Sequence, residues 1–157
     1  MHSGLLPALA ATAVALLLST APALAEVVNF KAELSGAAEV PPNDSAGIGQ
    51  VSADFDTETK LLKWNITYED LTGPATAAHF HGPADPDVNA PPVIPVEEAD
   101  LSAGVTGEDK TSGSISGEAT LTDEQAADLT AGKWYFNIHT AEYPDGELRG
   151  QLPIEGI

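Results

Sequence analysis

The sequence contains no cysteine, and its only methionine is Met1. Without thiols the chain cannot form disulfides, hold iron–sulfur clusters, attach haem covalently in the c-type manner, or bind copper through a thiolate. Without a further methionine it also lacks a thioether ligand. A domain built from this chain must therefore be held together by packing alone, and any metal it binds must be held without sulfur.

Basic residues are scarce as well. Six Lys and Arg residues stand against 24 Asp and Glu residues, which gives a formal net charge of −18 at pH 7. A surface of this charge repels phosphate groups, so nucleic acid and anionic membrane surfaces are excluded as partners. Most of the acidic side chains are expected to form a solvated surface.

Long apolar runs are missing outside the N-terminus. The run from Leu5 to Leu18 is shorter than a membrane-spanning helix, and it leads to Ala23-Leu24-Ala25, a small-x-small pattern typical of signal-peptide cleavage sites. We predict a cleaved signal peptide at residues 1–25 and a single secreted or periplasmic domain at 26–157, with no membrane contact after cleavage. Because no Lys or Arg precedes the apolar run, a retained membrane anchor is the alternative.

Several segments alternate between polar and apolar residues with period two, as half-buried antiparallel strands do. The clearest are 28–34, 51–55, 62–68 and 115–121, and further strands are expected within 76–81, 91–98, 133–140 and 147–153. Thr122 and Gln125 form a capping-box pattern that predicts one short helix ending near Gly132. The sequence therefore predicts an all-β fold, a β-sandwich or Greek-key barrel of about eight short strands.

Histidine is scarce too, with four residues at positions 2, 79, 81 and 139. In "AHFH" the apolar face belongs to Phe80, so His79 and His81 both point the other way. In "WYFNIH" the apolar face belongs to positions 134, 136 and 138, which leaves His139 on the polar face. All three histidines beyond the N-terminal segment therefore lie on the outward faces of predicted strands.

Two imidazoles at i and i+2 on one strand, joined by a third from a neighbouring strand, match the ligands of catalytic zinc and non-blue copper centres. We predict that His79, His81 and His139 bind copper or zinc, with the affinity order slightly favouring Cu(II). Tyr135 and Asn137 share the face of His139 and are predicted to hold its ring in place. The alternative is that the imidazoles only form hydrogen bonds with nearby loops.

Three segments resemble the CHRD domain family, named after chordin: "FKAELSGAAEVPP", "TAAHFHGPA" and "WYFNIHTAEYPDGELRGQL". The resemblance extends over residues 28–152 and implies an immunoglobulin-like β-sandwich in an exported protein, of a kind common as single-domain bacterial members. It implies no substrate, because the molecular activity of the family is poorly defined. The loop after His81 departs from the family pattern, since it is acidic and proline-rich rather than glycine-rich.

A more distant similarity is to copper–zinc superoxide dismutase. That family also carries an H-x-H strand, a later copper-binding histidine and a late arginine, which His79, His81, His139 and Arg149 loosely match. The bridging histidine, the zinc-site histidines and the subunit disulfide have no counterpart here. Arg149 is expected either to pair with Glu147 or Glu142 or to guide an anion toward the metal.

The sequence thus predicts an exported protein that binds copper or zinc for sequestration or delivery, and it singles out no catalytic residue. One alternative is a mononuclear copper enzyme that carries out redox chemistry on superoxide or a similar small species. The other is an extracellular protein-interaction module without metal, whose protein partner the sequence does not identify.

Overall fold

The structure is a computed structural model that describes residues 24–153. The predicted signal peptide lies outside the described residues except for positions 24 and 25, so its cleavage stays a prediction. Within the described part, no helix is long and apolar enough to cross a membrane. The elements are β1 (Val27–Ser35), the short 3-10 helix η1 (Gly36–Ala38), β2 (Ile48–Asp56), β3 (Leu61–Glu69), β4 (Ala75–His81), β5 (Pro92–Pro95), α1 (Glu98–Ala103), β6 (Gly104–Thr106), β7 (Ser112–Thr120), α2 (Asp123–Thr130), β8 (Tyr135–Thr140) and β9 (Leu148–Gln151).

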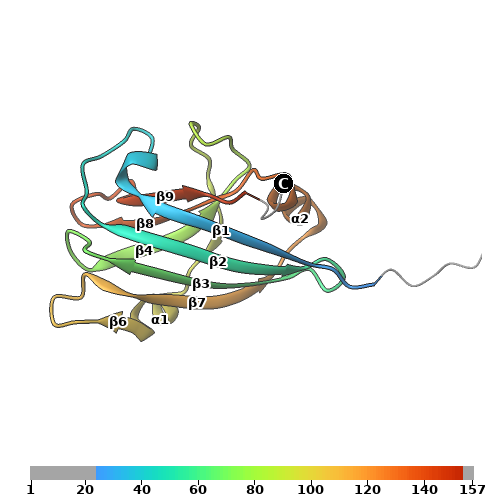
Figure 1. The fold of residues 1–157 in the computed structure, drawn as a ribbon, viewed down its shortest axis with the longest axis horizontal. Coiled ribbons are helices and arrows are strands. Elements are labelled where there is room, and N and C mark those ends of the chain that lie inside the picture. The colour runs from blue at the N-terminus through green and yellow to red at the C-terminus, as the bar shows by residue number, and fades with distance from the viewer. Residues whose placement is uncertain (1–23, 154–157) are drawn as a thin grey trace, which may run out of the picture.

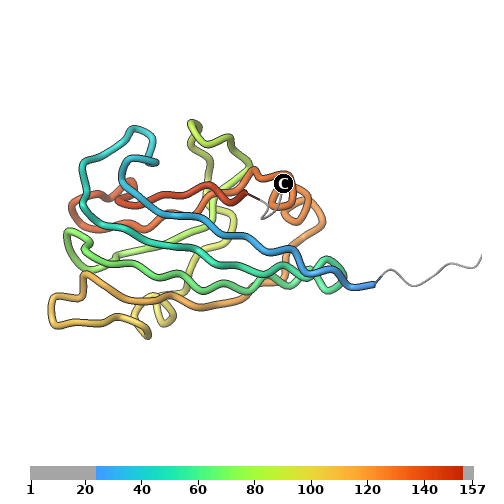
Figure 2. The backbone as a smooth tube through the Cα atoms, viewed as in Figure 1, coloured from blue at the N-terminus to red at the C-terminus, as the bar shows by residue number. Residues whose placement is uncertain are grey.

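The nine strands form one sheet in the order β5-β4-β8-β9-β1-β2-β3-β7-β6, with neighbours antiparallel. The sheet curls on itself, as Figures 1 and 2 show. The rings of Trp64 on β3 and Phe80 on β4 lie 5.1 Å apart between centroids, although four strands separate β3 from β4 in the sheet. The curl therefore brings two halves of the sheet together around one core, and the predicted all-β sandwich is confirmed.

The alternation seen in the sequence sets which side chains enter this core. Along β3, the buried positions 62, 64, 66 and 68 alternate with exposed polar ones. On β4 and β8, Phe80, Phe136 and Ile138 are completely buried and belong to the core. The opposite faces of β4 and β8, which carry the histidines, therefore point away from the core.

The predicted helix is confirmed as α2, which begins after Thr122 with the full capping box that Gln125 completes. Three elements were not expected, namely the short 3-10 helix η1, α1 and the short strand β6 that pairs with β7. The helix α1 has six residues and no side-chain cap at its N-terminus. Neither a capping pattern nor a repeated apolar period marks it in the sequence.

Two loops lie against the outward face of β4, β8 and β9. One is the segment 82–91 between β4 and β5, and the other is the segment 36–47 between β1 and β2; both extend from the body of the molecule in Figure 2. Asn89 joins them by donating a hydrogen bond of 2.8 Å to the carbonyl of Val40. The outward face is consequently covered at His81 and Asn137, which are buried, whereas His79 and His139 keep partial exposure.

Candidate metal centre

The pairing of β4 with β8 brings the three histidines together. In the register of these strands, His79 lies opposite Asn137 and Ala77 lies opposite His139, so the histidines occupy neighbouring outward positions. One ring nitrogen from each of the three can be chosen so that all lie within 4.8 Å of one another. The sequence-based prediction that these side chains share one place is thereby confirmed.

The separation of two of the rings suits a single ion. Nitrogen atoms bound at about 2 Å to one tetrahedral ion lie about 3.3 Å apart. His79 Nδ1 and His139 Nε2 are 3.1 Å apart. A metal could therefore be accommodated by these two rings with little movement, and His81 would approach from the same strand as His79.

Two loop carbonyls set the protonation of two rings. His81 Nδ1 lies 2.8 Å from the carbonyl oxygen of Ala90, and His139 Nδ1 lies 2.9 Å from that of Pro144. Because a carbonyl oxygen only accepts, Nδ1 of each ring must carry the proton and donate it. His81 Nε2 is then left with a free lone pair. The lone pair of His139 Nε2 faces His79 Nδ1 at 3.1 Å, where an ion could take the place of this hydrogen bond.

His79 is held in its neutral form. Desolvation, followed by the electrostatic influence of His139 and then His81, lowers the pKa of His79 from 6.5 to about 4. Burial is also the largest cause of the lowered pKa of His81; the contacts with Ala90 and Asn137 raise this pKa, and the charges of His139 and Arg149 lower it. Neutral imidazoles are the form that binds metals, so at pH 7 these two rings have no proton to lose before binding.

His81 carries the clearest sign of a missing partner. The residue is only 8% exposed, and its Nε2 atom is buried without a hydrogen-bond partner. Leaving a buried polar atom unpaired costs about 1–3 kcal/mol. A cation bound at Nε2 would remove that cost, so the residues present fit a copper or zinc ion.

Tyr135 supports the ring of His81 from one side. The two rings are stacked, with centroids 4.8 Å apart and planes inclined by 5°, and the guanidinium carbon of Arg149 lies 3.5 Å from the centre of the Tyr135 ring. The hydroxyl of Tyr135 donates to the carbonyl of Ala90, which is also the acceptor for His81. Tyr135 therefore contacts His81, rather than the His139 ring that the sequence suggested.

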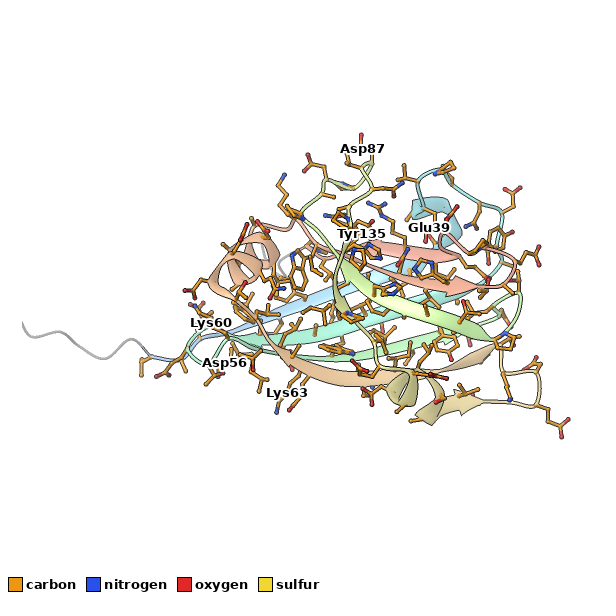
Figure 3. All side chains as sticks on the ribbon, turned by 180° about the vertical axis from the view of Figure 1, so that it is seen from behind. Glu39, Asp56, Lys60, Lys63, Asp87 and Tyr135 are labelled. Carbon is orange, nitrogen blue, oxygen red and sulfur yellow. The ribbon has the colours of Figure 1, made fainter. Side chains whose placement is uncertain are left out.

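Arg149 is 1% exposed and holds the loop above the site. It donates hydrogen bonds of 2.8 Å to Asn89 Oδ1 and to the carbonyl of Val88, and a longer one to Asp85. Figure 3 shows Tyr135 beneath the loop that carries Asp87. A guanidinium engaged in this way fastens the loop to the sheet.

The carboxylate of Glu147 has other partners than Arg149. Hydroxyl groups of Ser45, Thr72 and Thr140 donate to it at 2.6, 2.7 and 2.6 Å, and the backbone N–H of Thr72 donates at 2.9 Å. Desolvation opposes the charged form, yet these hydrogen bonds together outweigh it and lower the pKa of Glu147. Among the described residues Arg149 and Glu147 therefore do not form the expected ion pair. Arg149 binds the loop at Val88 and Asn89, and Glu147 accepts its hydrogen bonds from Ser45, Thr72 and Thr140.

Glu39 is a site residue that the sequence did not single out, although it lies in the "EVPP" stretch. It is 6% exposed, and burial is the main reason why its pKa is raised to about 7, against the charge of Arg149 and hydrogen bonds from Asn137 and Val40. Figure 3 places it on the same side of the molecule as Tyr135. The burial of Glu39 could not be predicted from the sequence, because a loop has no periodic pattern and its packing depends on the fold.

The model of the CHRD domain family matches residues 30–152, which is most of the chain. The protein belongs to the CHRD domain family. No curated protein and no solved structure matches the chain significantly. The distant similarity to superoxide dismutase therefore gains no support from these comparisons, and the chemistry of this CHRD domain has to be inferred from its own residues.

Proposed function

We propose that this CHRD domain binds one Cu(II) or Zn(II) ion through His79, His81 and His139, as an exported protein that sequesters or delivers the metal. The observation that carries the proposal is the buried, unpaired Nε2 atom of His81, which lies in a cluster with two other imidazoles. If the ring only anchored the loop through its Nδ1 bond to Ala90, the buried Nε2 would remain unpaired at a cost in stability, which a bound ion would remove. Three neutral nitrogen ligands without sulfur suit both ions.

The loops give the site its preorganisation. The carbonyls of Ala90 and Pro144 hold two rings in the tautomer that presents Nε2 to the ion. Such partners of metal-bound histidines typically change metal affinity by about 10–100-fold when removed. The negative charge of the whole chain would add a general attraction for cations.

Sequestration or delivery is favoured over redox catalysis by the position of Arg149. Anion guidance needs a guanidinium that faces the site and reaches solvent. Arg149 is 1% exposed, and two of its nitrogens already bind the loop at Asn89 and Val88. The proposal therefore assigns it to the loop and assigns no residue to catalysis.

The proposal is tested by isothermal titration calorimetry of metal-stripped protein with Cu(II) and with Zn(II). We expect one equivalent per chain, and a loss of at least about tenfold in affinity when any of the three histidines is replaced by Ala. Asn65→Ala is a matched control, because Asn65 is an exposed residue of β3 that binds Ser116. Unchanged stoichiometry and affinity in the double variant His79→Ala, His139→Ala would refute the site.

A further inference from the structure

Asn137 occupies the outward position of β8 that lies among all three histidines. It is directly opposite His79 across the strand pair and two residues before His139 on its own strand. Its side chain also interacts with the ring of His81, which is diagonal to it. Tyr135, which is diagonal to His79 on β8, stacks on the ring of His81 and on neither of the other two imidazoles.

The side-chain oxygen of Asn137 has no partner. The residue is 3% exposed, and Oδ1 is buried without a hydrogen bond among the described residues. His81 Nε2 is in the same condition, and it carries a lone pair because Nδ1 donates to Ala90. Two buried atoms that can only accept therefore face the same region, and only a donor or a cation can satisfy both.

Glu39 fixes which way the Asn137 amide points. The Asn137 side chain stabilises the charged form of the Glu39 carboxyl group, and its amide nitrogen Nδ2 lies with Glu39 Oε1 beside Gly146. The arrangement depends on Gly146, where a Cβ atom would overlap both Glu39 Oε1 and Asn137 Nδ2. With Nδ2 turned toward Glu39, the oxygen is turned toward the histidines.

We propose that Asn137 is a fourth protein ligand, which binds the metal through Oδ1 beside the three imidazoles. This inference rests on the metal site proposed above and goes beyond it, since it assigns a set of three nitrogens and one amide oxygen. Zinc sites with four protein ligands are characteristically structural, whereas catalytic ones keep a position for water. An oxygen ligand is also poorly suited to Cu(I), so the site would prefer Zn(II) and Cu(II).

The test compares Asn137→Leu, which removes the oxygen and keeps the branched shape of the side chain, with Asn137→Asp, which keeps an oxygen in the same place. We expect Asn137→Leu to weaken Zn(II) and Cu(II) binding by at least about tenfold, and Asn137→Asp to retain or exceed the affinity of the unmodified protein. The electron paramagnetic resonance spectrum of bound Cu(II) is the deciding readout, because it depends on the directly bound atoms. It should change in Asn137→Leu and stay the same in Asn65→Leu, the matched control on β3.

The outcomes separate the two proposals. If the unmodified protein binds no metal, the three-histidine site itself fails. If it binds metal and Asn137→Leu gives the same affinity, or a lower affinity with an unchanged copper spectrum, the histidine site stands and Asn137 is not a ligand. Circular dichroism establishes that each variant is folded, and Asn137→Ala replaces Asn137→Leu in the test should the larger side chain prevent folding.

Discussion

The buried carboxyl group of Glu39 gives a quantitative test of how the segment 36–47 packs on the sheet. In the folded protein the pKa of Glu39 is about 7, mainly because burial disfavours the charged form, and its ordinary value is 4.5. Between these two values the folded protein keeps a proton that the unfolded chain releases. The Glu39 contribution to the free energy of unfolding is therefore fully present below about pH 4.5 and is lost as the pH rises through about 7.

The size of this loss follows from the two pKa values, which differ by about 2.5, at about 1.4 kcal/mol for each pKa unit. The product, about 3–4 kcal/mol, is an upper bound for a group with no access to water. The pKa of about 7 already includes the opposing effects of Arg149 and of the two hydrogen bonds. Solvent screening lowers the energetic cost of the charge further, so we expect a measured loss of about 2 kcal/mol.

The assay is denaturant unfolding of metal-stripped protein and of Glu39→Gln at about pH 4.5 and about pH 8. Any pH-independent cost of the substitution cancels when the two pH-dependences are compared. His79, whose pKa is lowered to about 4, contributes the opposite slope, and it does so in both proteins. The unmodified protein should lose about 2 kcal/mol more than Glu39→Gln between the two pH values.

Glu33→Gln is the matched control, because Glu33 is an exposed position of β1. It should leave the pH-dependence of the unmodified protein almost unchanged. Equal pH-dependence in the unmodified protein and in Glu39→Gln would mean that the Glu39 carboxyl ionises normally in the folded state. The burial argument for the packing of segment 36–47 would then be wrong.

Three further predictions concern stability. Glu147→Gln should lower the free energy of unfolding by about 2–4 kcal/mol at pH 7, since the buried carboxylate accepts four hydrogen bonds that an amide cannot all accept. In the unmodified protein the stability that the Glu147 carboxylate provides should also disappear as the pH falls through its lowered pKa. Gly146→Ala should cost about 1–3 kcal/mol in the same denaturation assay, because Gly146 has φ = 134° and its position leaves no room for a Cβ; a neutral result would mean that the turn adapts easily. Raising sodium chloride from low to moderate concentration should increase the denaturation midpoint, because salt screens the repulsion within a chain of net charge −18; a flat or falling midpoint would contradict this.

The faces of the strands could be predicted from the sequence because alternation with period two is a local property. Phe80 and Phe136 mark the core side of β4 and β8, and the structure confirms that the histidines are on the other side. What alternation does not encode is which strands are neighbours. The pairing of β4 with β8 joins segments that are about 60 residues apart, and it is this pairing that brings His139 to His79.

Burial on the outward face could not be predicted, since it depends on loops that have no regular pattern. The sequence places His81 and Asn137 on a polar face, where solvent exposure is the natural expectation. In the structure they are 8% and 3% exposed, and residues of the segments 36–47 and 82–91 contact them: Ala90 lies against His81, and Glu39 lies against Asn137. Arg149 was expected to pair with an acid, yet its hydrogen bonds hold one of these loops.

Strands and loops contribute differently to the proposed metal site. The strands determine where the three imidazoles lie, but the loop carbonyls at Ala90 and Pro144 determine which nitrogen faces the ion. A change that loosens either loop would therefore release a ring to rotate or change tautomer without altering any ligand. Metal affinity in this domain should consequently depend on contacts such as those of Arg149, which lie outside the ligand set and hold the loop that contains Ala90.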